Sequence, residues 1–131
     1  MQRLLTADAT VTLIDSILGP PISRETLCVL LDHEYRPVRC TVLESGATDA
    51  DDVLDVAEYV AGLALTLPIR HVVIASCRPC EAYSQHDIDR WFVLHSILDS
   101  AGLSLLEWFV RDAQTMVAVT PLVGEPSSWP G

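Results

Sequence analysis

The chain contains no lysine, and its basic residues, all arginines, number only eight against eighteen acidic residues. The resulting net charge of −10 repels nucleic-acid phosphates and anionic lipid headgroups. We therefore expect neither a nucleic acid nor a membrane surface among the partners of this protein.

Long apolar runs are also missing from the sequence. No stretch approaches the roughly 20 apolar residues that a transmembrane helix requires, and the N-terminal MQRLLTADAT lacks the apolar segment of a signal peptide. We therefore expect a cytoplasmic protein, in which the four cysteines stay mainly reduced. Half of the 131 residues are apolar, which suffices for the core of one domain without disulfide or metal support.

The spacing of apolar residues predicts the order α-β-β-α-β-α-β-β. The expected ranges are 8–18, 26–31, 38–43, 49–64, 71–76, 84–100, 105–110 and 115–120, with Thr48 or Asp49 capping the second helix. The strand at 71–76 has the continuous apolar run VVIA at its centre, as is typical of a central strand with helices on both sides. The sequence therefore predicts an α/β fold, a three-layer α-β-α sandwich on a mixed sheet.

We expect one domain at residues 26–120. Residues 1–25 precede it as a helix and a proline-proline linker, and residues 121–131 follow it as an irregular tail. The N-terminal helix is expected to pack on the domain or against a second copy. Trp129 is expected to fold back onto the body or onto a partner.

Two further expectations concern burial. Val38, Cys40 and Val42 alternate with polar residues and should form the buried face of their strand, with Cys28 roughly opposite Cys40 as a reduced neighbour. The inner stripe of the helix at 84–100 is expected to consist of Ile88, Trp91, Phe92, His95 and Leu98.

The stretch from Arg70 to Trp91 carries the candidate site, because chemistry in α/β proteins usually lies where a strand end meets a helix start. The order of elements resembles that of two zinc hydrolase families, the JAB/MPN (JAMM) domains and the cytidine deaminase-like domains. In detail, residues 26–120 resemble the RadC branch of the JAB/MPN families. The matching segments are Leu30-Leu31-Asp32, Gly46, VVIA, Ser84-Gln85-His86-Asp87, Ala101-Gly102-Leu103 and LLEWFV.

The resemblance also shows where this chain departs from the family. Active members hold zinc with two histidines and an aspartate, and an upstream glutamate acts as the base. The resemblance puts Ser76 and Arg78 at the histidine positions, Asp87 at the aspartate position and, less directly, Glu44 at that of the base. Serine is a poor zinc ligand, and a guanidinium cannot coordinate a cation. The resemblance thus implies a metal-free, catalytically inactive member that acts as a scaffold or interaction module, with a protein partner or a second copy.

Ser84 and Asp87 keep the family pattern, but their spacing is also that of a capping box at a helix start. The Arg78 guanidinium is placed to pair with Asp87 and to supply the positive charge that the metal would carry. We expect this pair to preserve the fold without the chemistry.

Cys77 and Cys80 form a C-x-x-C pair that leaves an alternative function open. A strand followed by such a pair and a helix resembles the redox site of thioredoxin, and cytidine deaminases place P-C-x-x-C at the same junction. A new zinc site from Cys77, Cys80, His86 and Asp87, with His71 as a further candidate, is the third possibility. The simplest interpretation is a loop of thiols without dedicated chemistry.

Overall fold

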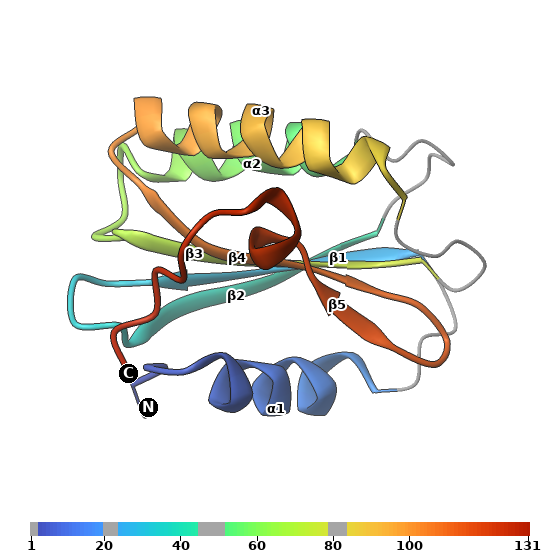
Figure 1. Cartoon of the computed structure of the whole chain (residues 1–131). Coiled ribbons are helices and arrows are strands. Elements are labelled where there is room, and N and C mark those ends of the chain that lie inside the picture. The colour runs from blue at the N-terminus through green and yellow to red at the C-terminus, as the bar shows by residue number, and fades with distance from the viewer. Residues whose placement is uncertain (1–2, 20–23, 45–51, 79–83) are drawn as a thin grey trace.

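The computed structural model describes residues 3–19, 24–44, 52–78 and 84–131, apart from the side chains of Glu44 and Asp52. Helices α2 (Asp52–Leu63) and α3 (His86–Ser100) lie on one face of a five-stranded sheet, and α1 (Ala7–Leu18) lies on the other (Figure 1). The predicted α/β class and the mixed sheet are confirmed. Within the described ranges, no helix combines the length and apolarity needed to cross a membrane.

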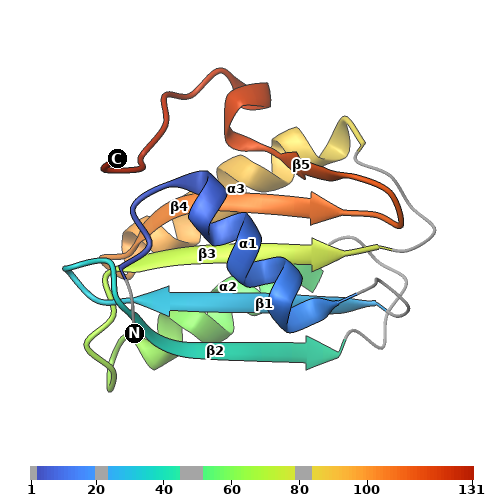
Figure 2. The same ribbon diagram turned by 90° about the horizontal axis from the view of Figure 1, so that it is seen from below.

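The sheet consists of β1 (Glu25–Leu31), β2 (Pro37–Glu44), β3 (His71–Cys77), β4 (Ser104–Arg111) and β5 (Met116–Ala118). Their order across the sheet is β2-β1-β3-β4-β5, and only β3 and β4 run parallel (Figure 2). A parallel pair requires a crossover connection, which α3 supplies. This crossover brings the start of α3 back over the end of β3, where the candidate site lies.

Two apolar clusters fill the space above and below the sheet. Along β3, Val72 and Ile74 belong to the cluster under α2 and α3, whereas Val73 and Ala75 belong to the cluster facing α1. This alternation is the two-residue period of a strand. The apolar spacing of 49–64 also predicts a buried stripe of Val53, Val56, Ala57, Val60 and Ala64 on α2; the first four are buried and Ala64 is partly buried, while the expected cap lies outside the described residues.

The expected inner stripe of α3 is wrong in part. Trp91 and Leu98 are buried as expected, but Phe92 and His95 are exposed. The buried positions are Asp87, Trp91, Leu94 and Leu98. One residue corresponds to about 100° around a helix, so the helix is rotated by less than one position from the expected orientation. The reason is Asp87, a charged residue on the inner face that apolar spacing does not reveal.

The expected burial of β2 is also wrong. Val38, Cys40 and Val42 are all exposed, because β2 is an edge strand and α1 crosses the sheet without reaching it (Figure 2). Cys40 pairs with Val29, and Cys28 pairs with Thr41. A register difference of one residue puts the two thiols on opposite faces of the sheet, so they are not neighbours in one core.

The C-terminal segment is more ordered than a plain tail. β5 spans only three residues, and a 3-10 helix follows at Thr120–Val123, with Pro121 inside its first turn. Beyond it the chain returns to the N-terminal segment, where the Gly131 N–H donates to the Leu5 carbonyl at 2.9 Å. Trp129 packs against the cluster facing α1, so it folds back onto the body as expected.

Candidate functional site

The candidate site lies at the C-terminal end of β3. Ser76 and Arg78 continue the row of Val72 and Ile74, so both side chains point toward the helices α2 and α3. The backbone N–H of Arg78 donates to the carbonyl of Arg111 at 2.8 Å and extends the contact with β4 by one residue. The end of β3 therefore places the side chains of Ser76 and Arg78 beside the start of α3.

Arg78 and Asp87 form a buried bidentate ion pair at this junction. Arg78 Nη1 donates to Asp87 Oδ2 at 2.9 Å, and Nη2 donates to Oδ1 at 3.0 Å. The Arg78 side chain is 5% exposed and that of Asp87 is fully buried. Two parallel N–H···O bonds between a guanidinium and a carboxylate are the strongest geometry for such a pair. The predicted pairing of Arg78 with Asp87 is confirmed.

The Asp87 carboxylate has two further donors. Ser84 N–H donates to Oδ2 at 2.9 Å, and Arg90 Nη1 donates to Oδ1 at 3.1 Å. Burial alone would raise the pKa of this carboxyl group, but the hydrogen bonds from Arg78 and Ser84 outweigh it and lower the pKa. A carboxylate offers about four acceptor positions, so these four bonds use its full capacity.

The capping interpretation of Ser84 and Asp87 is half confirmed. The Asp87 side chain reaches back to the Ser84 N–H, as the acid of a capping box does. Among the hydrogen bonds of the described residues, however, none joins the Ser84 hydroxyl to a backbone N–H of α3. The first turn is closed instead by the Asp87 N–H, which donates to the Ser84 carbonyl at 3.0 Å.

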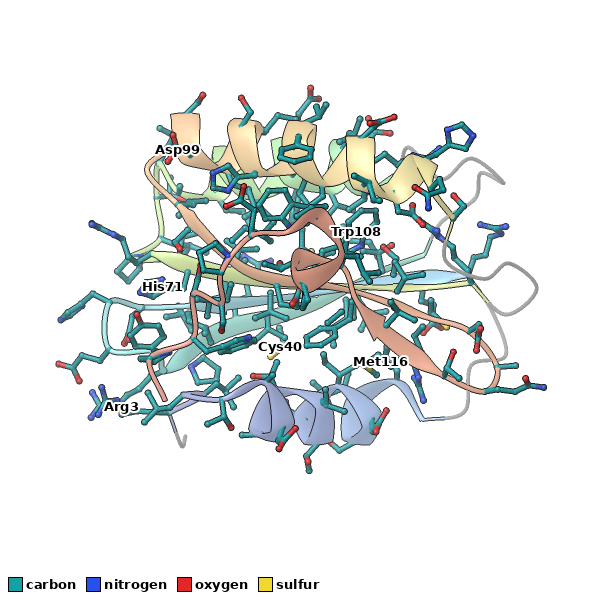
Figure 3. The ribbon with its side chains drawn as sticks, in the orientation of Figure 1. Arg3, Cys40, His71, Asp99, Trp108 and Met116 are labelled. Atoms are coloured by element: carbon teal, nitrogen blue, oxygen red, sulfur yellow. The ribbon has the colours of Figure 1, made fainter. Side chains whose placement is uncertain are left out.

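Trp108 of β4 closes the site from below. Its indole Nε1–H donates to Ser76 Oγ at 2.9 Å, and the Arg78 guanidinium carbon lies 5.7 Å from the centre of its ring. Trp108 is fully buried between the sheet and the helices (Figure 3). The distance suits a cation–π contact, so Arg78 is held by a carboxylate on one side and an aromatic face on the other.

This set of side chains does not suit a zinc ion. The Ser76 hydroxyl is hydrogen-bonded to Trp108, and Arg78 brings a positive charge to a position where the resemblance to the JAB/MPN families implies a zinc ligand. Asp87 has no free acceptor position for a metal. Zinc requires deprotonated or neutral ligands with an available lone pair. Arg78 and Asp87 offer none, and the neutral hydroxyl of Ser76 is a poor zinc ligand.

Of the alternative zinc set, the described members do not come together. His71 opens β3, roughly 16 Å from Ser76 along the strand at about 3.3 Å per residue, and Figure 3 places it at the far end of the sheet. His86 is exposed, and the Asp87 oxygens are occupied. Cys80 lies outside the described residues. In the part of the chain that is described, no three potential metal ligands come together.

Cys77 points away from the ion pair. It lies between Ser76 and Arg78 in the strand, so its side chain faces the α1 side. Burial raises the pKa of this thiol, and the nearby Arg111 charge only partly opposes the effect. A thioredoxin-like nucleophile needs the opposite shift. The described geometry therefore gives the redox hypothesis no support from Cys77.

Glu44, the position suggested for a catalytic base, ends β2. Its backbone pairs with Glu25, whose other neighbour across the sheet is Cys77. Position 44 therefore lies two strands away from the ion pair, in register with Cys77 rather than with Ser76 or Arg78. Its side chain is outside the described part of the structure.

Three residues of this region were not anticipated from the sequence: Arg90, Glu107 and Trp108. Arg90 follows Asp87 by three residues on α3, a spacing at which helix side chains meet, so its contact with Asp87 could have been predicted. A sequence signal was also present for Glu107, which is the single acidic residue in the apolar run LLEWFV. No sequence signal pointed to Trp108, because its contact with Ser76, 32 positions earlier in the chain, depends on the parallel register of β3 and β4.

Glu107 builds a second buried polar cluster beside the first. Its Oε2 accepts from the N–H groups of Trp108 at 3.0 Å and Thr120 at 2.9 Å, and from the Thr120 hydroxyl at 2.6 Å. The Thr120 oxygen in turn accepts from Trp91 Nε1 at 3.1 Å. Burial raises the pKa of Glu107 despite these bonds. The cluster attaches the C-terminal 3-10 helix to β4 and α3.

The fold and this site together define an α/β protein whose strand–helix junction is closed by an ion pair. No protein-family model matches the chain, and no curated protein matches its sequence.

Proposed function

We propose that this protein is a catalytically inactive, RadC-like member of the JAB/MPN group that acts in protein interaction. The order of its helices and strands and the position of Ser84 and Asp87 at the start of α3 support the assignment. The single observation that supports our inference of lost activity is the buried bidentate ion pair of Arg78 with Asp87. In an active member, a histidine and an aspartate at these positions would bind the metal.

The ion pair explains how such a domain keeps its fold without a metal. A buried aspartate on an inner helix face needs a positive partner. In an active member the zinc ion supplies that charge, and here the Arg78 guanidinium supplies it from the end of β3. The pair thus satisfies the charge of Asp87 but presents no open coordination position and no activated water.

An interaction role is the function that remains for such a domain. Members of the wider MPN group that lack the metal site serve as binding subunits, and we use them as an analogy. We propose a protein partner or a second copy of the chain as the ligand, in the cytoplasm, where the cysteines remain reduced.

The proposal is tested by the zinc content of the protein and of a variant with the histidines restored. Purified without chelators, the wild-type chain is expected to contain no stoichiometric zinc and to hydrolyse no isopeptide substrate. Ser76→His/Arg78→His places two imidazoles on one face of β3, opposite an Asp87 that has lost its bidentate partner. This variant is expected to bind close to one zinc ion per chain, measured by elemental analysis and by zinc titration.

The matched control adds Asp87→Asn to the two histidine substitutions and should lose most of the zinc affinity. Stoichiometric zinc in the wild-type protein, bound through Asp87, would overturn the loss of the metal site. A well-folded double variant without zinc affinity would contradict the JAB/MPN assignment of these positions.

A further inference from the structure

We infer that β2 is the interaction surface of this protein and that its occupant is a second copy of the chain, paired β2 to β2 across a two-fold axis. This inference rests on the proposed interaction role and names its surface and partner. The two β2 strands would run antiparallel and join the two sheets into one.

The first argument is the open edge of the sheet. β2 and β5 are the two edge strands. β5 has three residues and leads directly into a 3-10 helix, whereas β2 runs for eight residues from Pro37 to Glu44. No other strand in the described ranges pairs with the outer side of β2. An edge of this length presents a row of unpaired N–H and C=O groups that suits another strand.

The second argument is the exposed apolar row on the α1 side of β2. Val38 is 39% exposed and Val42 is 43% exposed, and Cys40 lies exposed between them. In Figure 2, α1 crosses the sheet over β4, β3 and β1, beside β2 rather than over it. A hollow of about 370 Å³ is lined by residues of α1 and by Pro37. Edge strands are usually protected by charged residues, yet Arg39 is the only charged residue from 37 to 43.

The third argument is charge. Two copies that each carry −10 repel one another over most of their surfaces. Residues 37–43 contain no acidic residue and one arginine, so this edge avoids that repulsion. A second copy can therefore approach along β2 more easily than along the acidic helices.

The fourth argument is that the strand is complementary to itself in one register. With Cys40 on the two-fold axis, Val38 lies opposite Val42 of the second copy, Cys40 opposite Cys40, and Arg39 opposite Thr41. Every apolar residue of the exposed row then meets another on the same face of the joined sheet.

The neighbouring registers are less favourable. An axis through Arg39 places two arginines directly opposite each other, and like charges in that position destabilise a strand pair. An axis through Thr41 places Val38 opposite Glu44. Registers shifted by one position turn the apolar row of one copy to the opposite face of the other. The register centred on Cys40 is therefore the one that the sequence of β2 favours.

The oligomeric state tests this inference directly. Light scattering under reducing conditions is expected to give twice the 14.4 kDa mass of one chain. Val42→Asp and Val38→Lys should each raise the dissociation constant at least about tenfold, since each change occurs twice in the dimer. The double variant Val38→Lys/Val42→Asp should restore the dimer, because each introduced lysine then lies opposite an introduced aspartate.

Val93→Asp on α3 is the matched control, since Val93 is 46% exposed, close to the 43% of Val42, and lies outside β2. This variant should remain dimeric. Circular dichroism on every variant separates loss of pairing from loss of folding, and the restored dimer of the double variant excludes unfolding as the cause.

Mild oxidation tests the register. Opposed residues in antiparallel strands have Cα atoms about 4.5–5.5 Å apart, within the disulfide range of about 4.4–6.8 Å. A covalent dimer should therefore form through Cys40, disappear in Cys40→Ser and persist in Cys80→Ser.

A wild-type chain that is monomeric, or one that pairs only with a strand of another protein, would overturn the second copy as the occupant. A dimer unaffected by Val42→Asp would overturn β2 as the surface, and a dimer without the Cys40 cross-link would overturn the register. None of these results depends on zinc content, so failure of the dimer and failure of the inactive-hydrolase proposal remain distinguishable.

Discussion

Replacing Arg78 with methionine tests the role of the ion pair in the fold. The change keeps much of the side-chain volume and removes the charge that faces Asp87, a carboxylate with no exposed surface. Removal of one partner from a buried pair typically costs about 3–5 kcal/mol. Asp87 retains the Ser84 N–H and Arg90, whose side chain is 18% exposed. We therefore expect a loss near the lower limit, about 3 kcal/mol.

A loss of this size lowers the melting temperature of a chain of this length by roughly 10 °C. Urea unfolding at neutral pH, followed by the fluorescence of the buried Trp91 and Trp108, measures it directly. Arg36→Met is the control, because Arg36 pairs with Glu34 at the surface, where both side chains are more than 40% exposed. Such a pair contributes at most about 1 kcal/mol.

The pH dependence gives a second criterion. The folded-state pKa of Asp87 is lowered, so its contribution to stability is fully present above the unfolded value of about 4 and is lost as the pH falls through the folded value. The advantage of the wild-type chain over Arg78→Met should therefore shrink in acid. An Arg78→Met variant that unfolds within 1 kcal/mol of the wild type at neutral pH, like the Arg36 control, would refute the assignment of a structural role to the pair.

Two further predictions concern the remaining buried groups. Alkylation of native protein with iodoacetamide near neutral pH should modify Cys77 far more slowly than Cys40, because the Cys77 side chain is buried and that of Cys40 is exposed, while burial raises the pKa of both thiols. Fast modification of Cys77, located by mass spectrometry, would support the thioredoxin-like hypothesis. Glu107→Ala should cost about 2 kcal/mol or more, because it leaves the N–H groups of Trp108 and Thr120 unpaired, whereas Glu107→Gln keeps an acceptor. Because burial raises the folded-state pKa of Glu107, the contribution of this residue to stability is present below about 4 and is lost as the pH rises through the folded value. Glu107→Gln should remove this part of the pH dependence, which urea unfolding at several pH values measures.

The sequence predicts the elements well where apolar spacing determines them. β3 reads VVIA at its centre and is buried on both faces, and the stripe of α2 from Val53 to Val60 follows a helical period. A continuous apolar run indicates a strand buried on both faces, and a helical period indicates a helix buried on one face. The pairing of Arg78 with Asp87 was also predictable, because two residues at one strand–helix junction with opposite charges have few other partners.

The sequence could not predict which side of β2 would be covered. Alternation of Val38, Cys40 and Val42 with polar residues indicates a strand with one apolar face, but it does not say that a helix lies on that face. Coverage depends on where α1 crosses the sheet and on the position of β2 at the edge. The contact of Trp108 with Ser76 could not be predicted either, because it depends on which strands are neighbours in the sheet and not on the local sequence pattern.

The buried ion pair also selects one orientation of α3. This helix has apolar residues on several sides, and since Phe92 and Val93 are exposed, other rotations of the helix would also bury apolar side chains. Only the observed rotation brings Asp87 to Arg78. A chain with both charges replaced by apolar residues could remain folded, but α3 would then have competing positions on the sheet. We expect such a chain to lose the uniqueness of its native state before it loses its stability.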